Sequence, residues 1–159
     1  MKRNVIAVLL FFLLISCSKS NEPVVSFYYW KTIFKLSDNE KSTLKDNNVT
    51  KLYMRYFDIG LHPKTQEPIP IAPIRFQNKT DHLEIVPVIF IQNKIMLKSN
   101  LNIEDLAQKS VHLVEEINLK NKIGCTEIQI DCDWTLASKD NYLKFIEAFR
   151  KLWKKKLSA

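Results

Sequence analysis

Glycine is nearly missing from this chain, which has only two glycines among its 159 residues. Loops that cradle the phosphates of nucleotides use several glycines, because the backbone must approach the phosphate closely and adopt conformations that other residues avoid. Two glycines cannot supply that repeated pattern. The composition therefore argues against a dinucleotide site or a glycine-rich phosphate loop.

Cysteine and histidine are also scarce, and their spacing fits neither a disulfide nor a metal site. Cys125 and Cys132 lie on or beside one predicted strand, about 23 Å apart and on opposite faces. A disulfide needs Cα atoms within about 7 Å. His62, His82 and His112 are scattered and have no partners at metal-ligand spacing. We therefore expect no intramolecular disulfide, no bound metal and no cofactor.

Long hydrophobic runs are missing too, although the chain begins with a short one. Residues 4–15 are almost wholly apolar and follow two basic residues, which is the order found in export signals. The run is too short to span a membrane, which takes about 20 apolar residues. It ends in a tetrapeptide that resembles the bacterial lipobox, Leu14-Ile15-Ser16-Cys17.

The lipobox resemblance implies an exported, lipid-anchored protein. Residues 1–16 are then a signal peptide that is cleaved before Cys17, and acyl chains attach to the Cys17 sulfur and to the new amino terminus. Several acyl chains on one terminus give stable anchoring to a membrane. Residues 17–23 form a short polar tether whose sequence is compatible with the outer membrane if the cell has two. The alternative is an ordinary signal peptide or an uncleaved anchor.

The chain carries an excess of basic residues, with 24 lysines and arginines against 17 aspartates and glutamates, a net charge of +7. Loss of Lys2 and Arg3 with the signal peptide lowers this charge to +5. Much of it lies in the run 150–156. Such a run contacts anionic lipid or nucleic acid in some proteins, but it more often marks a solvated helix end, where cations suit the helix dipole. Because an exported protein has little access to nucleic acid, we expect no nucleic-acid partner.

Four short runs rich in β-branched and aromatic residues predict strands. They cover residues 24–30, 51–57, 84–91 and 126–131. Capping signals at Ser37, Asn102 and Ser138 predict helices that alternate with them, and the proline-rich segment 60–76 is typical of a long loop. Such alternation is characteristic of α/β proteins with a parallel sheet.

The predicted fold is therefore α/β, built from parallel βα units in one domain over residues 24–159. The residue pattern fits a (β/α)₈ barrel best, but that barrel needs about 250 residues. We expect either the four-stranded half of a barrel or a small open sheet. On the first interpretation residues 24–159 are a truncated barrel-like domain, and the lysine-rich end after Phe149 has no structural role.

The last predicted strand carries the most informative pattern. Glu127, Gln129, Asp131 and Asp133 alternate with apolar residues, so their side chains share one face of the strand. Asp131 and Asp133 lie at its carboxyl end, where barrel enzymes keep their catalytic groups. Their Cα atoms are expected about 6.6 Å apart. Like charges that close raise one pKa, as in an acid–base pair.

The other strands supply partners at their carboxyl ends. Arg55 is expected to share a face with Tyr53 and Phe57, and side chains of three kinds, aromatic, charged and amide, gather at this edge. Such a set suits a sugar, because rings stack on its C–H patches while carboxylates bind its hydroxyls. Core packing of the rings, and an ion pair of Arg55 with Asp58 or Asp131, are the alternatives. The candidate substrate-binding residues are Trp30, Arg55, Asp58, Gln92, Gln129 and Trp134.

These strands resemble the amino-terminal half of a family of uncharacterised bacterial lipoproteins that is expected to form glycoside-hydrolase-like TIM barrels. The resemblance covers nearly all of the chain after the tether. It rests on Phe-Tyr-Tyr-Trp at 27–30, Leu-Tyr-Met-Arg-Tyr-Phe-Asp at 52–58, Val-Pro-Val-Ile-Phe-Ile at 86–91 and Glu-Ile-Gln-Ile-Asp-Cys-Asp-Trp-Thr at 127–135.

A more distant resemblance is to the fourth strand of chitinase-like family 18 hydrolases, whose pattern is Asp-x-x-Asp-x-Asp-x-Glu. Asp131 matches the last aspartate and Asp133 the catalytic glutamate, while Gln129 and Thr126 replace the first two aspartates. In a complete barrel this resemblance implies that Asp133 is the catalytic acid and that Asp131 orients it and tunes its pKa. The two missing carboxylates and the shorter acid depart from the family pattern.

We therefore expect a membrane-tethered lipoprotein carrying a glycoside-hydrolase-like half-barrel that is inactive without the remaining strands. Its expected ligand is a polysaccharide or peptidoglycan. One alternative is a non-catalytic surface lipoprotein that binds glycans or proteins with the same face. Another is a homodimer in which two half-barrels complete each other, because four parallel strands leave two open edges.

Overall fold

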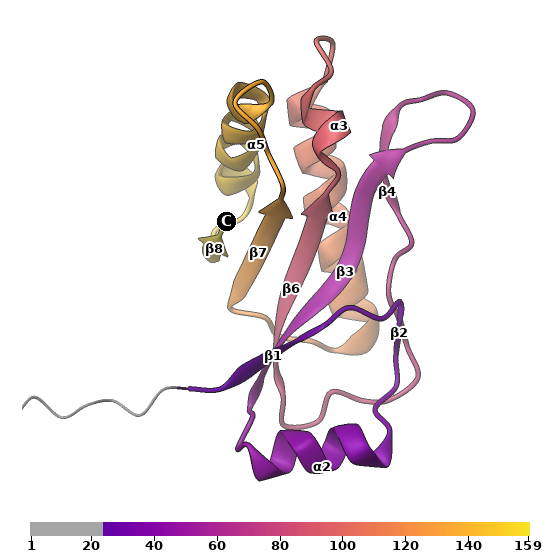
Figure 1. The fold of residues 1–159 in the computed structure, drawn as a ribbon, viewed down its shortest axis with the longest axis vertical. Coiled ribbons are helices and arrows are strands. Elements are labelled where there is room, and N and C mark those ends of the chain that lie inside the picture. The colour runs from indigo at the N-terminus through magenta and orange to yellow at the C-terminus, as the bar shows by residue number, and fades with distance from the viewer. Residues whose placement is uncertain (1–23) are drawn as a thin grey trace, which may run out of the picture.

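The computed structural model describes residues 24–159, which Figure 1 shows as a ribbon. The predicted signal peptide (residues 1–16), the predicted lipid site Cys17 and the tether (residues 17–23) lie outside the described residues. The elements in chain order are β1 (Ser26–Tyr29), β2 (Ile33–Phe34), α2 (Asp38–Asp46), β3 (Lys51–Leu61), β4 (Pro68–Ile71), β5 (Arg75–Phe76), β6 (Glu84–Ile91), α3 (Asn93–Met96), α4 (Ile103–Asn121), β7 (Glu127–Cys132), α5 (Lys139–Leu152) and β8 (Lys156–Ser158).

Five parallel strands form the central sheet in the order β1-β3-β6-β7-β8, and β4 pairs with β3 in the antiparallel sense. The parallel strands lie side by side in their chain order (Figure 1). The predicted α/β class and parallel sheet are confirmed. The sheet is open, with β1 and β8 as its edge strands.

The lysine-rich end of the chain has a structural role, contrary to the expectation from the sequence. Helix α5 continues to Leu152, Trp153 packs into the core with 5% exposure, and β8 then pairs with β7. The sheet has one parallel strand more than the four predicted. A three-residue strand that begins with lysine has no apolar run, so the sequence pattern gave no signal for it.

Segment 60–76, predicted as a loop, contains the two short strands β4 and β5. β3 runs on to Leu61 and pairs with β4, so that Asp58 lies opposite Ile71 and Leu61 lies opposite Pro68. Prolines lack the amide hydrogen that an inner strand needs, and they are tolerated in an edge strand such as β4. The prolines therefore mark an edge and not the absence of a strand.

Two of the three predicted helix caps are confirmed. The Ser37 side chain accepts from the Glu40 amide in a complete capping box, and the Asn102 side chain accepts from the Asp105 amide. Ser138 precedes α5 but makes no cap hydrogen bond. Its hydroxyl instead accepts from the Thr135 amide at 2.9 Å, because the connection from β7 turns tightly before the helix starts.

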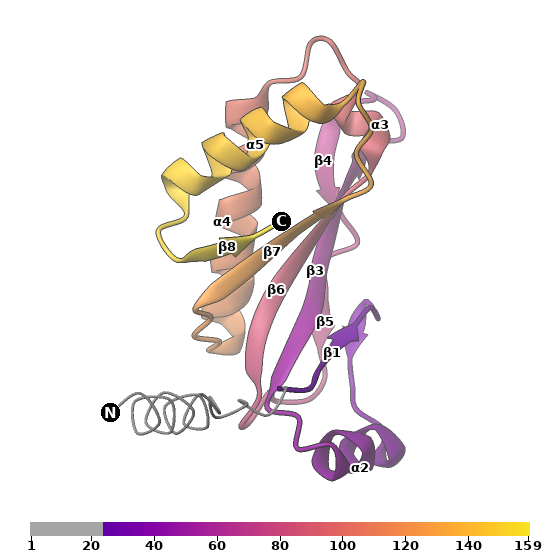
Figure 2. The same ribbon diagram turned by 60° about the vertical axis from the view of Figure 1, so that its left-hand side comes forward.

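The core lies between one face of the sheet and helices α4 and α5, which Figure 2 shows on the same side. The apolar residues of β7, Ile128 and Ile130, are buried on this side, as the alternation predicted. Tyr56 anchors α4 by a hydrogen bond from its hydroxyl to Asn118 Oδ1 at 2.7 Å. Burial of apolar surface stabilises the layer by about 25 cal/mol per Å². No helix within residues 24–159 is long and apolar enough to span a bilayer.

Charged side chains cross the sheet where the parallel strands begin, on the face away from the helices. Lys51 Nζ lies 3.1 Å from Glu84 Oε1 and 3.7 Å from Glu127 Oε2, and Lys156 Nζ lies 2.8 Å from Glu127. Burial raises the pKa of the Glu127 carboxyl, but hydrogen bonds from Lys156 and Ser158 and the charges of both lysines outweigh it. The pKa of Glu127 is therefore lowered, and the carboxylate joins β3, β7 and β8.

Replacing Glu127 tests this ion network. A lowered folded pKa contributes stability above the unfolded value of 4.5, and that contribution is lost as the pH falls through the folded pKa. Glu127→Gln should lower the free energy of unfolding by about 1–2 kcal/mol at pH 7, and the difference should shrink below pH 4.5. Urea unfolding at pH 7 and pH 3 measures it, with the exposed Glu147→Gln as control. An equal loss at both pH values would contradict the assignment.

Candidate functional site

The candidate site residues lie on the sheet face away from α4 and α5. The pairing register aligns the strands in rows across β3, β6 and β7. One row is Arg55, Val88 and Gln129, and the next row toward the carboxyl ends is Asp58, Phe90 and Asp131. Gln92 and Asp133 follow the ends of β6 and β7, and Trp30 follows β1. The structure thus brings the predicted residues of four strands to one face.

A β-bulge at Tyr56 places Arg55 and Asp58 together. Arg55 pairs with Val88, but Phe57 pairs with the next residue of β6, Ile89, so one residue of β3 has no partner. Without the bulge, residues three apart would point to opposite faces. Arg55 Nε instead lies 2.7 Å from Asp58 Oδ1. The bulge also turns Phe57 into the core, so the prediction that Phe57 shares a face with Arg55 is wrong.

This ion pair satisfies both charges. Arg55 is 8% exposed, and its guanidinium also donates to the Ala72 carbonyl oxygen at 3.3 Å. A buried cation of this kind is stable because its partner carboxylate and carbonyl replace water. Arg55 and Asp58 therefore bind each other within this face. Of the alternatives considered from the sequence, the structure shows the ion pair of Arg55 with Asp58.

Three aromatic rings form a row at the β1 side of this face. Trp30 stacks on Tyr28 with ring centroids 5.6 Å apart and planes 10° apart, and Tyr28 lies 5.0 Å from Tyr53. Trp30 is 47% exposed and Tyr28 is 49% exposed. The sequence prediction included Trp30 but did not assign Tyr53 to the site. Tyr53 belongs to the row because it is the register partner of Tyr28 in the pairing of β1 with β3.

The sheet curls toward this face. Tyr28 Oη donates to Gln129 Oε1 at 2.9 Å, although β3 and β6 separate β1 from β7. In a flat sheet those two strands would be about 14 Å apart. A direct hydrogen bond across this span requires curvature and long side chains. Val86 and Val88 between them are completely buried although they face away from the helices.

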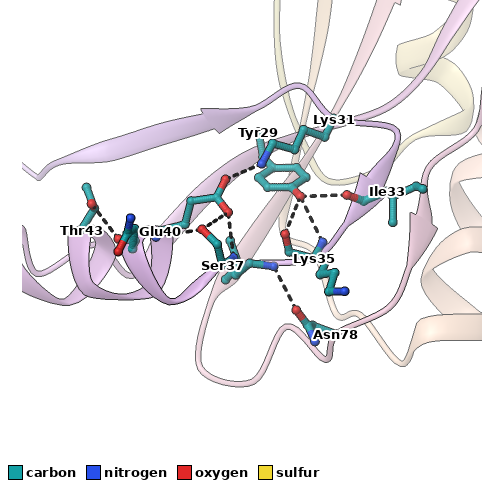
Figure 3. Close-up of polar contacts among 10 residues, drawn as sticks. Tyr29, Lys31, Ile33, Lys35, Ser37, Glu40, Thr43 and Asn78 are labelled. Atoms are coloured by element: carbon teal, nitrogen blue, oxygen red, sulfur yellow. Dashed lines mark hydrogen bonds and ion pairs between the residues drawn. The ribbon is translucent and has the colours of Figure 1, made fainter.

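The two residues that flank Trp30 in the sequence, Tyr29 and Lys31, make the polar contacts that Figure 3 shows. The Tyr29 hydroxyl donates to the Ile33 carbonyl oxygen at 2.8 Å and accepts from the Lys35 amide at 3.0 Å. Lys31 Nζ lies 2.7 Å from Glu40 Oε1. The bonds from Lys31, and then from the Ser37 amide and hydroxyl, lower the pKa of Glu40 to about 2. Trp30 therefore directly follows β1, between two residues whose side chains are held by these contacts.

Two carboxylates with different environments lie beyond this aromatic row. Asp131 is the second-to-last residue of β7 and is half-buried, whereas Asp133 is exposed directly after the strand. Burial, and then repulsion from Asp133, raise the pKa of Asp131, although a hydrogen bond from the Cys132 amide acts the other way. Between them, burial and the two carboxylates raise the pKa of Cys132 to about 11. A raised pKa disfavours the thiolate, which is the nucleophilic form of cysteine, at neutral pH.

Two of the predicted binding residues lie at the margins of this face. Trp134 stacks on Tyr142 of α5, with ring centroids 6.1 Å apart, so its ring is directed to the helix layer. Gln92 follows β6, and a Cβ added at Gly60 would lie 3.4 Å from Gln92 Nε2. That distance is an ordinary contact, whereas the same Cβ would lie only 2.5 Å from Ile71 Cδ1, so Gly60 leaves room for Ile71. The sequence could not place Trp134, because the tight turn after Cys132 ends the strand alternation.

Within residues 24–159 no group of three or more histidine, cysteine or acidic side chains is placed to hold a metal ion. Cys125 and Cys132 are free thiols. Comparison with protein-family models, with curated proteins and with solved structures found no match to this chain. The residues and their geometry are consequently the basis for the function proposed below.

The raised pKa of Asp131 gives a test by pH. A carboxyl group with a raised folded pKa destabilises the fold above that pKa and not below its ordinary value of 3.8. Asp131→Asn should raise the free energy of unfolding by about 0.5 kcal/mol at pH 7, and the gain should vanish at pH 3. Urea unfolding measures both. Asp133→Asn should give part of the same gain. The gains of the two substitutions should not add, because both remove the same repulsion between Asp131 and Asp133. A less stable Asp131→Asn protein at pH 7 would contradict the prediction.

Proposed function

We propose that this chain is a lipid-anchored surface protein whose open sheet face binds glycans. The observation that carries the proposal is the stacked pair Trp30 and Tyr28, nearly half exposed, on the same face as Gln129 and Asp131. Large exposed rings are unusual on a surface with no ligand, because their apolar area is better buried. A sugar covers such rings with its C–H patches and offers hydroxyls to the polar groups nearby.

Pre-organisation supports binding at this face. Tyr29 and Lys31 fix the backbone around Trp30, and the bond between Tyr28 and Gln129 holds the second ring in place. Side chains that are already ordered lose less conformational freedom when a ligand binds. The carboxylates of Asp131 and Asp133, together with the Gln92 amide, then supply acceptors and donors for hydroxyl groups.

Binding without cleavage is the function that this geometry favours. Glycosidases place two carboxyl groups on either side of the scissile bond, about 5–5.5 Å or 6.5–9.5 Å apart. Asp131 lies in β7 and Asp133 directly follows it, so both would approach a sugar from the same side, and Asp58 is paired with Arg55. Catalysis with Asp133 as acid and Asp131 as its orienting partner is the second candidate, which the raised pKa of Asp131 favours.

The aromatic row gives a direct test. Residues 18–159 should be retained on insoluble polysaccharides in a panel of peptidoglycan sacculi, chitin and cellulose, without releasing reducing sugar. Trp30→Ala should weaken retention at least about tenfold, because it removes the exposed ring of the stack. Trp134→Ala is the matched control, since Trp134 is 44% exposed but directed to α5. Equal losses in both variants, or no retention of the parent on the panel, would contradict glycan binding, and reducing-sugar release lost in Asp133→Asn would support the catalytic candidate.

The lipid anchor is tested separately in cells. The full chain expressed in a bacterium should incorporate labelled palmitate and sediment with membranes, and Cys17→Ser should abolish the label because the acceptor sulfur is gone. Cys132→Ser is the control, because this half-buried thiol lies at the end of β7 and should not affect labelling. Unchanged labelling of Cys17→Ser would overturn the proposed anchor.

A further inference from the structure

Helices α4 and α5 both end where the parallel strands begin. Each helix runs back across the sheet, and the chain then enters the next strand, β7 after α4 and β8 after α5. The described chain also enters β1 from this edge, as the views in Figures 1 and 2 agree. The two helix ends and the start of β1 therefore all lie where the parallel strands begin, with β1 and β8 at opposite edges of the sheet.

Exposed cations gather at these two helix ends. Lys120 and Lys122 come from the end of α4, and Arg150, Lys151 and Lys154 come from the end of α5. Among residues 24–159, none of these five lies within 4.0 Å of a carboxylate. They therefore form a positively charged surface.

Helix dipoles account for only part of this cluster. Cations in the last turn of a helix suit its negative pole, which explains Lys120, Arg150 and Lys151. The dipole does not explain the exposed leucines beside them, Leu119 at 83% and Leu152 at 42%. Both leucines line one hollow of about 580 Å³ between the helix ends.

We propose that this surface docks on a bilayer with anionic lipid headgroups. We define the basic end as the five cations and two leucines, Lys120, Lys122, Arg150, Lys151, Lys154, Leu119 and Leu152. Cations beside exposed apolar side chains are the combination that binds a membrane interface, where the cations meet lipid phosphates and the apolar groups reach the acyl boundary. Glu115 also lines the hollow and reduces its positive charge by one.

The position of the tether favours a membrane over other polyanions. The inference rests on the proposed anchor at Cys17, which is nine residues before Ser26 and so at most about 30 Å from it when fully extended. A chain this short holds the basic end close to the bilayer, and the high local concentration lets weak contacts add to the anchor. The carboxyl ends of the strands, with Asp131 and Asp133, then point away from the membrane.

Two neighbouring lysines are structural and are left out of the test. Lys155 Nζ donates to the Cys125 carbonyl oxygen at 2.8 Å and lies 5.3 Å from the centroid of the Trp153 ring. Lys156 pairs with the buried Glu127. Changing either would disturb β8 and confuse a loss of binding with a loss of fold.

The test uses residues 18–159, which lack Cys17 and contain every core side chain that the structure describes. This form should co-sediment with vesicles of phosphatidylglycerol and phosphatidylcholine, weaken as salt is raised, and not bind pure phosphatidylcholine. Each surface cation contributes about fivefold in affinity, so the triple variant K120Q/K122Q/K154Q should lose about 100-fold. The matched control K64Q/K94Q/K139Q makes the same charge change on other exposed lysines and should lose less than about threefold.

A second variant distinguishes lipid from other polyanions. L119A/L152A should weaken vesicle binding severalfold and leave heparin binding unchanged, with the same unfolding temperature as the parent. Equal losses in the two triple variants, equal binding to zwitterionic vesicles, or heparin binding without vesicle binding would each overturn the proposal. Because the tested form lacks Cys17, failure of the anchor would show in the palmitate experiment and failure of docking in this one.

Discussion

Parallel strand pairing is the constraint on which the rest of this structure depends. A parallel strand can follow another only if the chain crosses back, and here α4 and α5 make two of those crossings on one side of the sheet. One sheet face is therefore buried under helices and the other is left to the side chains of the strands. The crossings also give the sheet two different ends. The parallel strands begin and helices α4 and α5 finish at one end, and the strands finish at the other end.

The uncovered face is organised by contacts between its own side chains. The bulge at Tyr56 brings Arg55 and Asp58 together, and the bond between Tyr28 and Gln129 spans two intervening strands. The first contact depends on the bulge and the second on the curvature of the sheet, because a flat and regular sheet would separate both pairs. The rings of Trp30 and Tyr28 remain nearly half exposed on this face.

The proposed glycan site and the proposed membrane surface are compatible because they lie at different places on the fold. Polar groups for a ligand end β7 and follow it, whereas the basic end is formed where α4 and α5 finish. A domain docked by its basic end would present Asp131 and Asp133 to the surroundings of the cell. The proposed anchor and the basic end would then both lie toward the membrane, and the carboxylates of the proposed binding face would lie away from it.

The sequence by itself determined the α/β class, the parallel sheet and the shared face of Gln129 and Asp131, because periodicity and capping are local signals. It could not determine β8 or the bulge at Tyr56. A strand as short as β8 forms only when β7 lies beside it, and a bulge is decided by the register between two strands. The ion pair of Arg55 and Asp58 depends on that bulge. The contact of Tyr28 with Gln129 joins residues far apart in sequence, which meet only after the sheet has curled.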